Sequence, residues 1–131
     1  MRVLFDTNIL ISAFLFPGGQ GEAALLNIVE GRDQLILSKP ILHELLEVLA
    51  RKFSHDHEEL AHIAVYLEEL AEFIQPRIRL NILEDEPDNR ILECAVTGKA
   101  NAVVTGDRAI LQLGEFQSIR LISLKNYLEL S

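Results

Sequence analysis

The fold class is decided by the stretch RVLFDTNILIS, residues 2–12. Its first four residues carry branched and aromatic side chains and predict a strand over Arg2–Phe5. Asp6 follows at once and stands before a run of helical periodicity, where an aspartate suits a helix N-cap. A strand, an acid and a helix in direct succession predict the first unit of an α/β protein.

The same alternation continues along the chain. Branched segments predict further strands over Gln34–Ser38, Ala102–Thr105 and Ile119–Ile122, and an additional one over Ile78–Asn81 after Pro76. Helical periodicity predicts the intervening helices: Asn8–Phe16, Glu22–Glu30, Pro40–Phe73 broken at Ser54–Glu59, Asn89–Thr97, Ala109–Leu113 and Leu124–Leu130. We therefore expect one domain over residues 1–131, with a three-layer α/β/α fold and a central, mostly parallel sheet of four to five strands.

Local signals mark the ends of several of these elements. Gly31, Gly98 and Gly114 each follow a helical segment, where a left-handed C-cap favours glycine. Ser38 precedes Pro40 and suits an N-cap followed by a first-turn proline. The sequence PGGQG, residues 17–21, predicts a loop, because three glycines and a proline in five positions oppose regular structure.

The amino-acid composition and net charge limit the classes of function that the chain can have. A hydrophobic content of 49% with 24% charged residues is typical of a soluble globular protein, and the lone Cys94 in an apolar run is expected to be a buried hydrophobe. The apolar run Ile9–Phe16 is far shorter than the roughly 20 residues of a membrane span, and Asp6 interrupts a signal peptide, so we expect a cytoplasmic protein. The net charge of −8 opposes a surface that coats nucleic acid generally, although it suits a basic protein partner.

Four acids are expected to meet at one edge of the sheet. Asp6 and Asp107 follow predicted strands, and the carboxyl ends of parallel strands share the edge where α/β folds bind ligands. Glu44 lies about one turn into the helix after the second strand, and Asp88 stands at the start of another helix, after Pro87. Crowded carboxylates are costly unless a cation lies between them, and hard divalent cations prefer oxygen ligands. Such a site activates water for phosphodiester hydrolysis.

Each acid also has a purely structural interpretation. Taken singly, Asp6 and Asp107 fit helix N-caps as well as they fit metal ligands. Asp88 fits a helix-dipole partner within the acidic run EDEPD, residues 84–88, most of which we expect to be a solvated loop. Glu44 alone fits a surface glutamate. It is the joint placement of the four acids that favours a metal site.

Several segments of the chain resemble the motifs of a known family. Residues 3–12 resemble the opening motif of PIN domains, the family that includes VapC-type toxin nucleases. DNRILECA, residues 88–95, and VVTGD, residues 103–107, resemble its third and fourth motifs, and Glu44 within ILHEL, residues 41–45, matches its second acid. The segment Phe16–Gly19 resembles a PIN subgroup described as toxin components of toxin–antitoxin systems.

The resemblance implies a Mg²⁺- or Mn²⁺-dependent endoribonuclease. It makes Asp6, Glu44, Asp88 and Asp107 the metal-binding catalytic acids, with Asn8 and Thr105 as polar support. It also implies an RNA substrate, a cognate antitoxin protein and a homodimer. None of the four acids is missing from the sequence, so the motifs do not indicate an inactive enzyme.

Other functions remain open at this point. A metal-dependent phosphatase generally has a second aspartate two residues after the first, where this chain has Asn8. A structure-specific DNA nuclease shares the metal chemistry but usually needs a larger helical arch. A non-catalytic RNA- or protein-binding PIN-like module would be marked by loss of an acid.

The histidines invite a zinc interpretation. His55 and His57 would face opposite ways on a helix, and with His62 they lie in and beyond a polar break. We therefore expect a solvated turn there.

Overall fold

The computed structural model describes residues 1–130 of the chain, and within them a six-stranded sheet has the order β3-β2-β1-β4-β6-β5. In chain order the strands are β1 (Arg2–Phe5), β2 (Gln34–Leu37), β3 (Glu72–Phe73), β4 (Ala102–Val104), β5 (Glu115–Phe116) and β6 (Ile119–Ile122). The pairs β1–β2, β1–β4, β2–β3 and β4–β6 are parallel, and β5 pairs antiparallel with β6. The sheet is therefore mostly parallel, as predicted.

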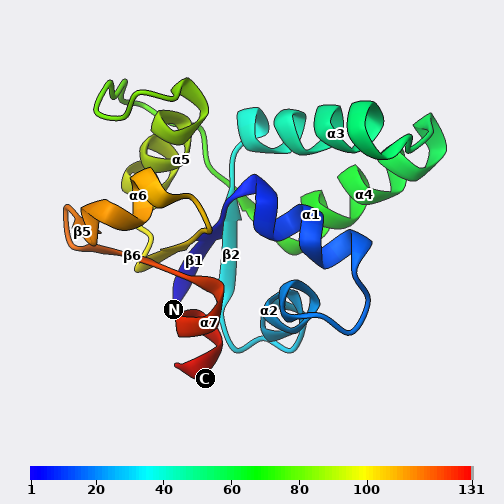
Figure 1. Cartoon of the computed structure of the whole chain (residues 1–131), viewed down its shortest axis with the longest axis horizontal. Helices are drawn as coiled ribbons and strands as arrows, with labels where there is room; N and C mark the ends of the chain where they lie inside the picture. Colours follow the sequence, from blue (N-terminus) through cyan, green and yellow to red (C-terminus); the bar gives the residue numbers. More distant parts are fainter. Residues whose placement is uncertain (131) are drawn as a thin grey trace.

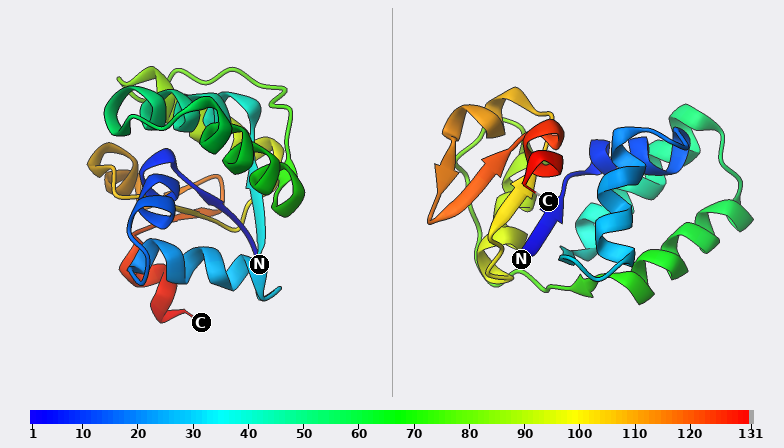
Figure 2. Two further views of the ribbon diagram at one scale, coloured as in Figure 1. Left: turned by 90° about the vertical axis from the view of Figure 1, so that its right-hand side faces the viewer. Right: turned by 90° about the horizontal axis from the view of Figure 1, so that it is seen from below.

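Helices cover both faces of this sheet. They are α1 (Thr7–Leu15), α2 (Gln20–Val29), α3 (Lys39–Phe53), α4 (His57–Leu70), α5 (Glu86–Thr97), α6 (Arg108–Leu113) and α7 (Leu124–Glu129). In Figure 1, α1 to α4 lie on one side of β1 and β2, and α5 and α6 lie on the other. The view from below in Figure 2 shows the same separation, which gives the predicted three layers.

The hydrophobic core is centred on the three middle strands. Val3, Leu4, the three residues Leu35 to Leu37 and the three residues Ala102 to Val104 are all fully buried. Strands covered on both faces need apolar residues on both faces, which explains their continuous apolar runs. This burial fixes the carboxyl ends of β1, β2 and β4 in a rigid frame.

The sheet differs from the expectation at its edges. It has six strands rather than four to five, because the two-residue strands β3 and β5 extend it on either side. The predicted strand over Ile78–Asn81 was wrong. The strand that pairs with β2 lies at Glu72–Phe73, before Pro76, and Ile78–Asn81 is irregular. There Leu80 donates its N–H to the Glu93 side chain instead of to a neighbouring strand.

Glycine roles were predicted correctly in part. Gly31 and Gly114 adopt the positive φ angles that favour glycine, 80° and 71°. Gly98 does not: its φ is −81°, and Lys99 takes the left-handed position with φ of 55°. Gly98 is explained by space, because an added Cβ would lie 2.7 Å from Ile36 Cδ1 and 2.9 Å from Ile74 Cγ1. The left-handed prediction for Gly98 was therefore wrong.

The predicted loop over residues 17–21 ends earlier than expected, since α2 already begins at Gln20. Gly21 lies inside this helix, where an added Cβ would be 2.7 Å from the backbone nitrogen of Ala13 and 2.8 Å from Ser12 Oγ. The absent side chain thus lets α2 approach α1 closely. The N-cap prediction for Ser38 was right, because its Oγ accepts a hydrogen bond from the Ile41 N–H at 3.4 Å.

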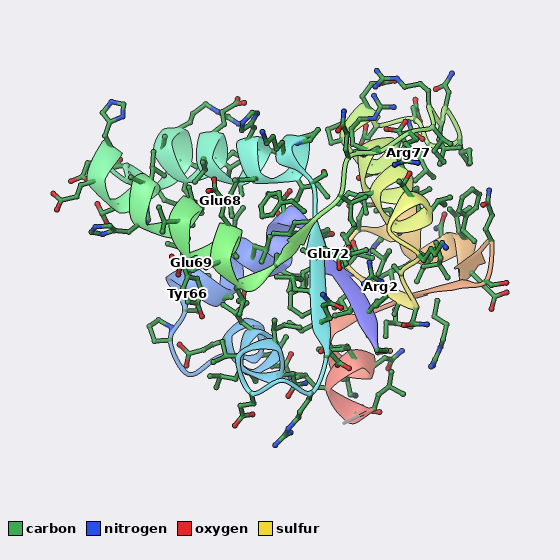
Figure 3. The ribbon with its side chains drawn as sticks, turned by 180° about the vertical axis from the view of Figure 1, so that it is seen from behind. Arg2, Tyr66, Glu68, Glu69, Glu72 and Arg77 are labelled. Atoms are coloured by element: carbon green, nitrogen blue, oxygen red, sulfur yellow. The ribbon has the colours of Figure 1, made fainter. Side chains whose placement is uncertain are left out.

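A polar cluster closes the amino-terminal edge of the sheet. The two terminal nitrogens of Arg2 bind the two carboxylate oxygens of Glu72 at 3.1 and 3.2 Å, and Arg2 also donates to the Gly98 carbonyl oxygen (Figure 3). These contacts tie β1 to β3 and to the end of α5. Figure 3 also shows Glu68 and Glu69 on α4, and both are exposed, as its amphipathic pattern predicts.

Within residues 1–130, every helix taken alone is too short or too polar to cross a membrane; α1 and α2 meet the length and composition test only as a pair bent by 98°.

Candidate metal centre

Asp6 and Asp107 come from neighbouring strands. Asp6 follows β1 and caps α1, where its Oδ1 accepts the Ile9 N–H at 3.1 Å. Asp107 follows β4 and caps α6, where its Oδ1 accepts the Ile110 N–H at 3.0 Å. Since β1 and β4 are parallel and adjacent, both carboxylates lie at the carboxyl edge of the sheet, the upper edge in Figure 1. Capping is thus present at both positions, and it occupies one oxygen of each acid.

Thr105 joins these two acids. Its side chain is fully buried, and its Oγ1 donates a hydrogen bond to Asp6 Oδ2. The same Oγ1 accepts the Asp107 N–H at 3.0 Å. Asn8, the other expected polar support, is exposed and binds Asp6 through its backbone N–H. The structure therefore gives Thr105 a direct part in orienting both carboxylates and gives Asn8 a backbone contact.

Glu44 approaches from α3. It is half-buried, and its Oε2 accepts a hydrogen bond from Thr7 Oγ1 at 3.1 Å. Thr7 lies in the first turn of α1, directly after Asp6. Thr7 was not predicted from the sequence, although its place beside the first acid was an available signal.

Asp88 lies with a second acid that the sequence analysis had placed in a solvated loop. Ligand atoms of Asp85, Asp88 and Asp107 all lie within 4.8 Å of one another. Asp85 precedes α5 and Asp88 lies in its first turn. Residues three apart face the same way at a helix start, so this spacing was the signal that could have identified Asp85. Its carboxylate belongs to the cluster, although the residue is exposed in an irregular segment, as the solvated-loop interpretation expected.

The electrostatics of the cluster reflect burial and crowding. Burial, followed by the negative charges of Asp107, Asp85, Asp6 and Glu44, raises the pKa of Asp88 from 3.8 to about 6. Burial also raises the pKa of Asp6, and the charge of Asp107 adds to this shift. Hydrogen bonds from Thr105, Ile9 and Asn8 lower the Asp6 pKa in part. The pKa of Asp88 therefore reflects the negative charges of the other four carboxylates.

A hard divalent cation fits this arrangement. Within residues 1–130, Asp88 Oδ2 is buried and has no hydrogen-bond partner. A buried carboxylate oxygen without a donor is costly, and a cation among oxygen ligands removes that cost. The donor set is purely carboxylate, which suits Mg²⁺ or Mn²⁺ better than softer metals. The chemistry available to such a centre is hydrolysis of a phosphate ester.

One of the hollows beside the helices adjoins these acids. A groove of about 380 Å³ between α3 and the start of α5 is lined by Glu44, Pro87 and Arg90 among others. A larger, mainly apolar hollow of about 520 Å³ lies between α1, α2 and α4 and contains none of the five acids. The size of a hollow therefore does not locate the chemistry in this fold.

The histidines lie outside the carboxylate group. His57 and His62 are exposed, and His55 Nε2 lies 3.8 Å from Glu59 Oε2. Among the described residues, no cluster with metal-ligand spacing includes a histidine.

Comparison with known proteins places this geometry in a family. The PIN-domain family profile matches residues 2–109, a range that contains all five acids. The chain belongs to the PIN-domain family. This PIN domain is 29% identical over 132 residues to an uncharacterized protein of Methanocaldococcus jannaschii, covering 95% of this chain and 84% of that protein.

Two of the solved structures with a similar fold contain VapBC proteins. One is VapBC2 from Rickettsia felis bound to a DNA fragment from its promoter, with a TM-score of 0.67 and 16% identity, covering 94% of this chain and 98% of that one. The other is VapBC-1 from nontypeable Haemophilus influenzae, with a TM-score of 0.66 and 17% identity, covering 95% and 99%. At these identities the likeness concerns the fold, and it agrees with the predicted α/β class.

Proposed function

We propose that this PIN domain is a Mg²⁺- or Mn²⁺-dependent endoribonuclease that hydrolyses RNA phosphodiester bonds. In this proposal Asp6, Glu44, Asp88 and Asp107 are the metal-binding catalytic acids. The observation that carries it is the buried, unpartnered Oδ2 of Asp88 inside a group of carboxylates from separate segments. Membership of the PIN-domain family supports the nuclease class.

In this proposal the side chains at the site have different roles. The carboxylates hold the cation, and Thr105 and Thr7 orient Asp6 and Glu44 by the hydrogen bonds described above. When bound, a divalent cation supplies positive charge to the scissile phosphate and lowers the pKa of an attacking water. The helix caps at Asp6 and Asp107 keep one oxygen of each acid fixed, so that the geometry of the site is set before substrate arrives.

We further propose that the protein is the toxin of a toxin–antitoxin pair, a cytoplasmic single-domain protein that forms a homodimer and binds a cognate antitoxin. The two similar solved structures are VapBC assemblies, which supports this partner class. The net charge of −8 suits a basic segment of such a partner.

The test is a cleavage assay with purified protein, using labelled RNA, single-stranded DNA and a phosphomonoester, each with Mn²⁺ and with chelator. RNA cleavage that requires metal supports the proposal. Cleavage of DNA alone would identify a DNA nuclease, release of phosphate would identify a phosphatase, and RNA binding without cleavage would identify a non-catalytic module. Each of these three results would overturn the proposed ribonuclease.

A further inference from the structure

We propose that Asp85 is a fifth carboxylate of the metal site and that Asn89 is the positioning residue that holds it there. The inference rests on the proposed function, because it requires a divalent cation among the other four acids. Asp85 lies outside the motifs quoted above, and Asn89 lies within residues 88–95 but was given no role there.

The Asp85 carboxylate does not cap the helix that it precedes. Asp85 is the N-cap residue of α5, yet within residues 1–130 its side chain makes no cap hydrogen bond. The other aspartates at N-cap positions, Asp6, Asp56 and Asp107, each accept a first-turn N–H. A capping bond contributes about 1 kcal/mol to stability, so its absence at Asp85 has a cost. A role in the carboxylate group, within 4.8 Å of Asp88 and Asp107 ligand atoms, accounts for that cost.

Asn89 forms hydrogen bonds with the backbone of the segment that precedes α5 and ends at Asp85. Its side chain is fully buried, and its Oδ1 accepts the N–H groups of Ile82 and Leu83, both at 2.9 Å. Its Nδ2 donates to the Leu83 carbonyl oxygen at 2.8 Å and to the Asp85 carbonyl oxygen at 3.5 Å. One amide therefore binds backbone groups of Ile82, Leu83 and Asp85.

The neighbouring residues of α5 extend this attachment. Glu93 is 2% exposed, and its Oε2 accepts the Leu80 N–H at 2.7 Å. Arg90 Nη2 donates to the Leu80 carbonyl oxygen at 3.1 Å. Residues 80–85, which we call the strap, are thus held by side chains of α5, although they form neither helix nor strand.

The strap explains how an exposed segment can present a metal ligand. Irregular segments are mobile unless their backbone groups are bound, and ligands must be held closely to coordinate a cation. Residues that orient a ligand typically change metal affinity ~10- to 100-fold when they are removed. Asn89 is placed to act in this way on Asp85.

The first experiment measures Mn²⁺ binding to the purified full chain by titration calorimetry, without substrate. Asp85→Asn should weaken binding ~10- to 100-fold, as loss of a site residue does. The matched control is Glu84→Gln, which removes the same charge from the preceding exposed residue outside the carboxylate group. This control should change the Kd by about twofold or less, because an exposed charge is screened.

The outcomes separate the two proposals. If Asp85→Asn and Glu84→Gln have the same Mn²⁺ Kd while the wild type binds Mn²⁺, the inference about Asp85 fails and the proposed function stands. If the wild type binds no Mn²⁺, both fail.

A second experiment tests Asn89 through a double-mutant cycle. Asn89→Ala should weaken Mn²⁺ binding about tenfold or more in the wild-type background, but much less in the Asp85→Asn background. Melting in chelator confirms that each variant is folded, and Asn89→Ser, which keeps a hydroxyl acceptor, replaces the alanine variant if that one does not fold. Equal weakening in both backgrounds would show that Asn89 does not act through Asp85.

Discussion

Replacing Asp88 by asparagine should raise the melting temperature of the metal-free protein at neutral pH. Asp88 is a better probe than Asp107, because Asp107 also caps a helix whereas Asp88 Oδ2 has no partner within residues 1–130. The new amide removes the negative charge and can donate to the neighbouring carboxylates. The change in melting temperature of this variant therefore measures how much the crowded carboxylates destabilise the metal-free protein.

The magnitude follows from the pKa of Asp88, which rises from 3.8 to about 6. A shift of roughly two units corresponds to about 3 kcal/mol at neutral pH, and partial exposure of the side chain reduces this to about 1–2 kcal/mol. For a chain of this size, that predicts a melting temperature higher by roughly 3–8 °C.

The direction of the Asp88 pKa shift determines how the stability difference between the two proteins changes with pH. The folded state binds the Asp88 proton more tightly than the unfolded state does, and this tighter binding stabilises the protonated wild type. The wild type has this stabilisation in full below about pH 4 and loses it as the pH rises through about 6. The advantage of Asp88→Asn should therefore be full at pH 7.5 and nearly absent at pH 4.

The assay is thermal unfolding of both proteins in chelator at these two pH values, followed by the neutral melts with Mn²⁺. Metal at about 100 times its Kd should stabilise the wild type by about 2.7 kcal/mol and the variant by much less. The reasoning is refuted if Asp88→Asn melts lower than the wild type in chelator at pH 7.5, or if its advantage does not shrink at pH 4.

Three further predictions concern activity and packing. Asp6→Asn should nearly abolish RNA cleavage without unfolding the protein, because asparagine keeps the α1 cap but supplies no charge; Glu44→Gln should be similar or milder, and wild-type turnover in the Asp6 variant would remove that residue from the site. Cleavage should leave 5′-phosphate and 3′-hydroxyl ends, even with 2′-deoxyribose at the scissile position, and end-labelled mapping that found 2′,3′-cyclic phosphates would contradict the mechanism. Gly98→Ala should lower the free energy of unfolding by about 1–3 kcal/mol in urea titrations, because the new methyl group would overlap Ile36 and Ile74; an unchanged midpoint would show that the contact relaxes freely.

The sequence predicted the middle of the molecule better than its edges. Arg2–Phe5 and Ile119–Ile122 were placed correctly because apolar runs between turn signals are local patterns. Glu72–Phe73 was missed because a two-residue strand has no periodicity, and its pairing with β2 is set by tertiary contacts. Gly98 was misinterpreted for a related reason, since the neighbours that exclude a side chain are distant in sequence.

The candidate site divides in the same way. The placement of Asp6 and Asp107 after strands predicted their meeting, because the topology of a parallel sheet brings such positions together. Asp85 was missed among its acidic neighbours Glu84 and Glu86, although its spacing of three residues from Asp88 was an available signal. What sets it apart in the structure is that its ligand atom lies within 4.8 Å of those of Asp88 and Asp107, a proximity that depends on the tertiary fold.

The carboxylates at the sheet edge are spread between positions 6 and 107 of the chain, and the hydrogen bond from Thr105 to Asp6 spans 99 residues. During synthesis, these two ends emerge on the order of 5–20 s apart at ordinary translation rates. Until β4 has left the ribosome and paired with β1, Asp6 lacks both its threonine partner and the acid beside it. A nascent or truncated chain therefore lacks the complete group of carboxylates, and the topology delays its assembly until most of the protein has been made.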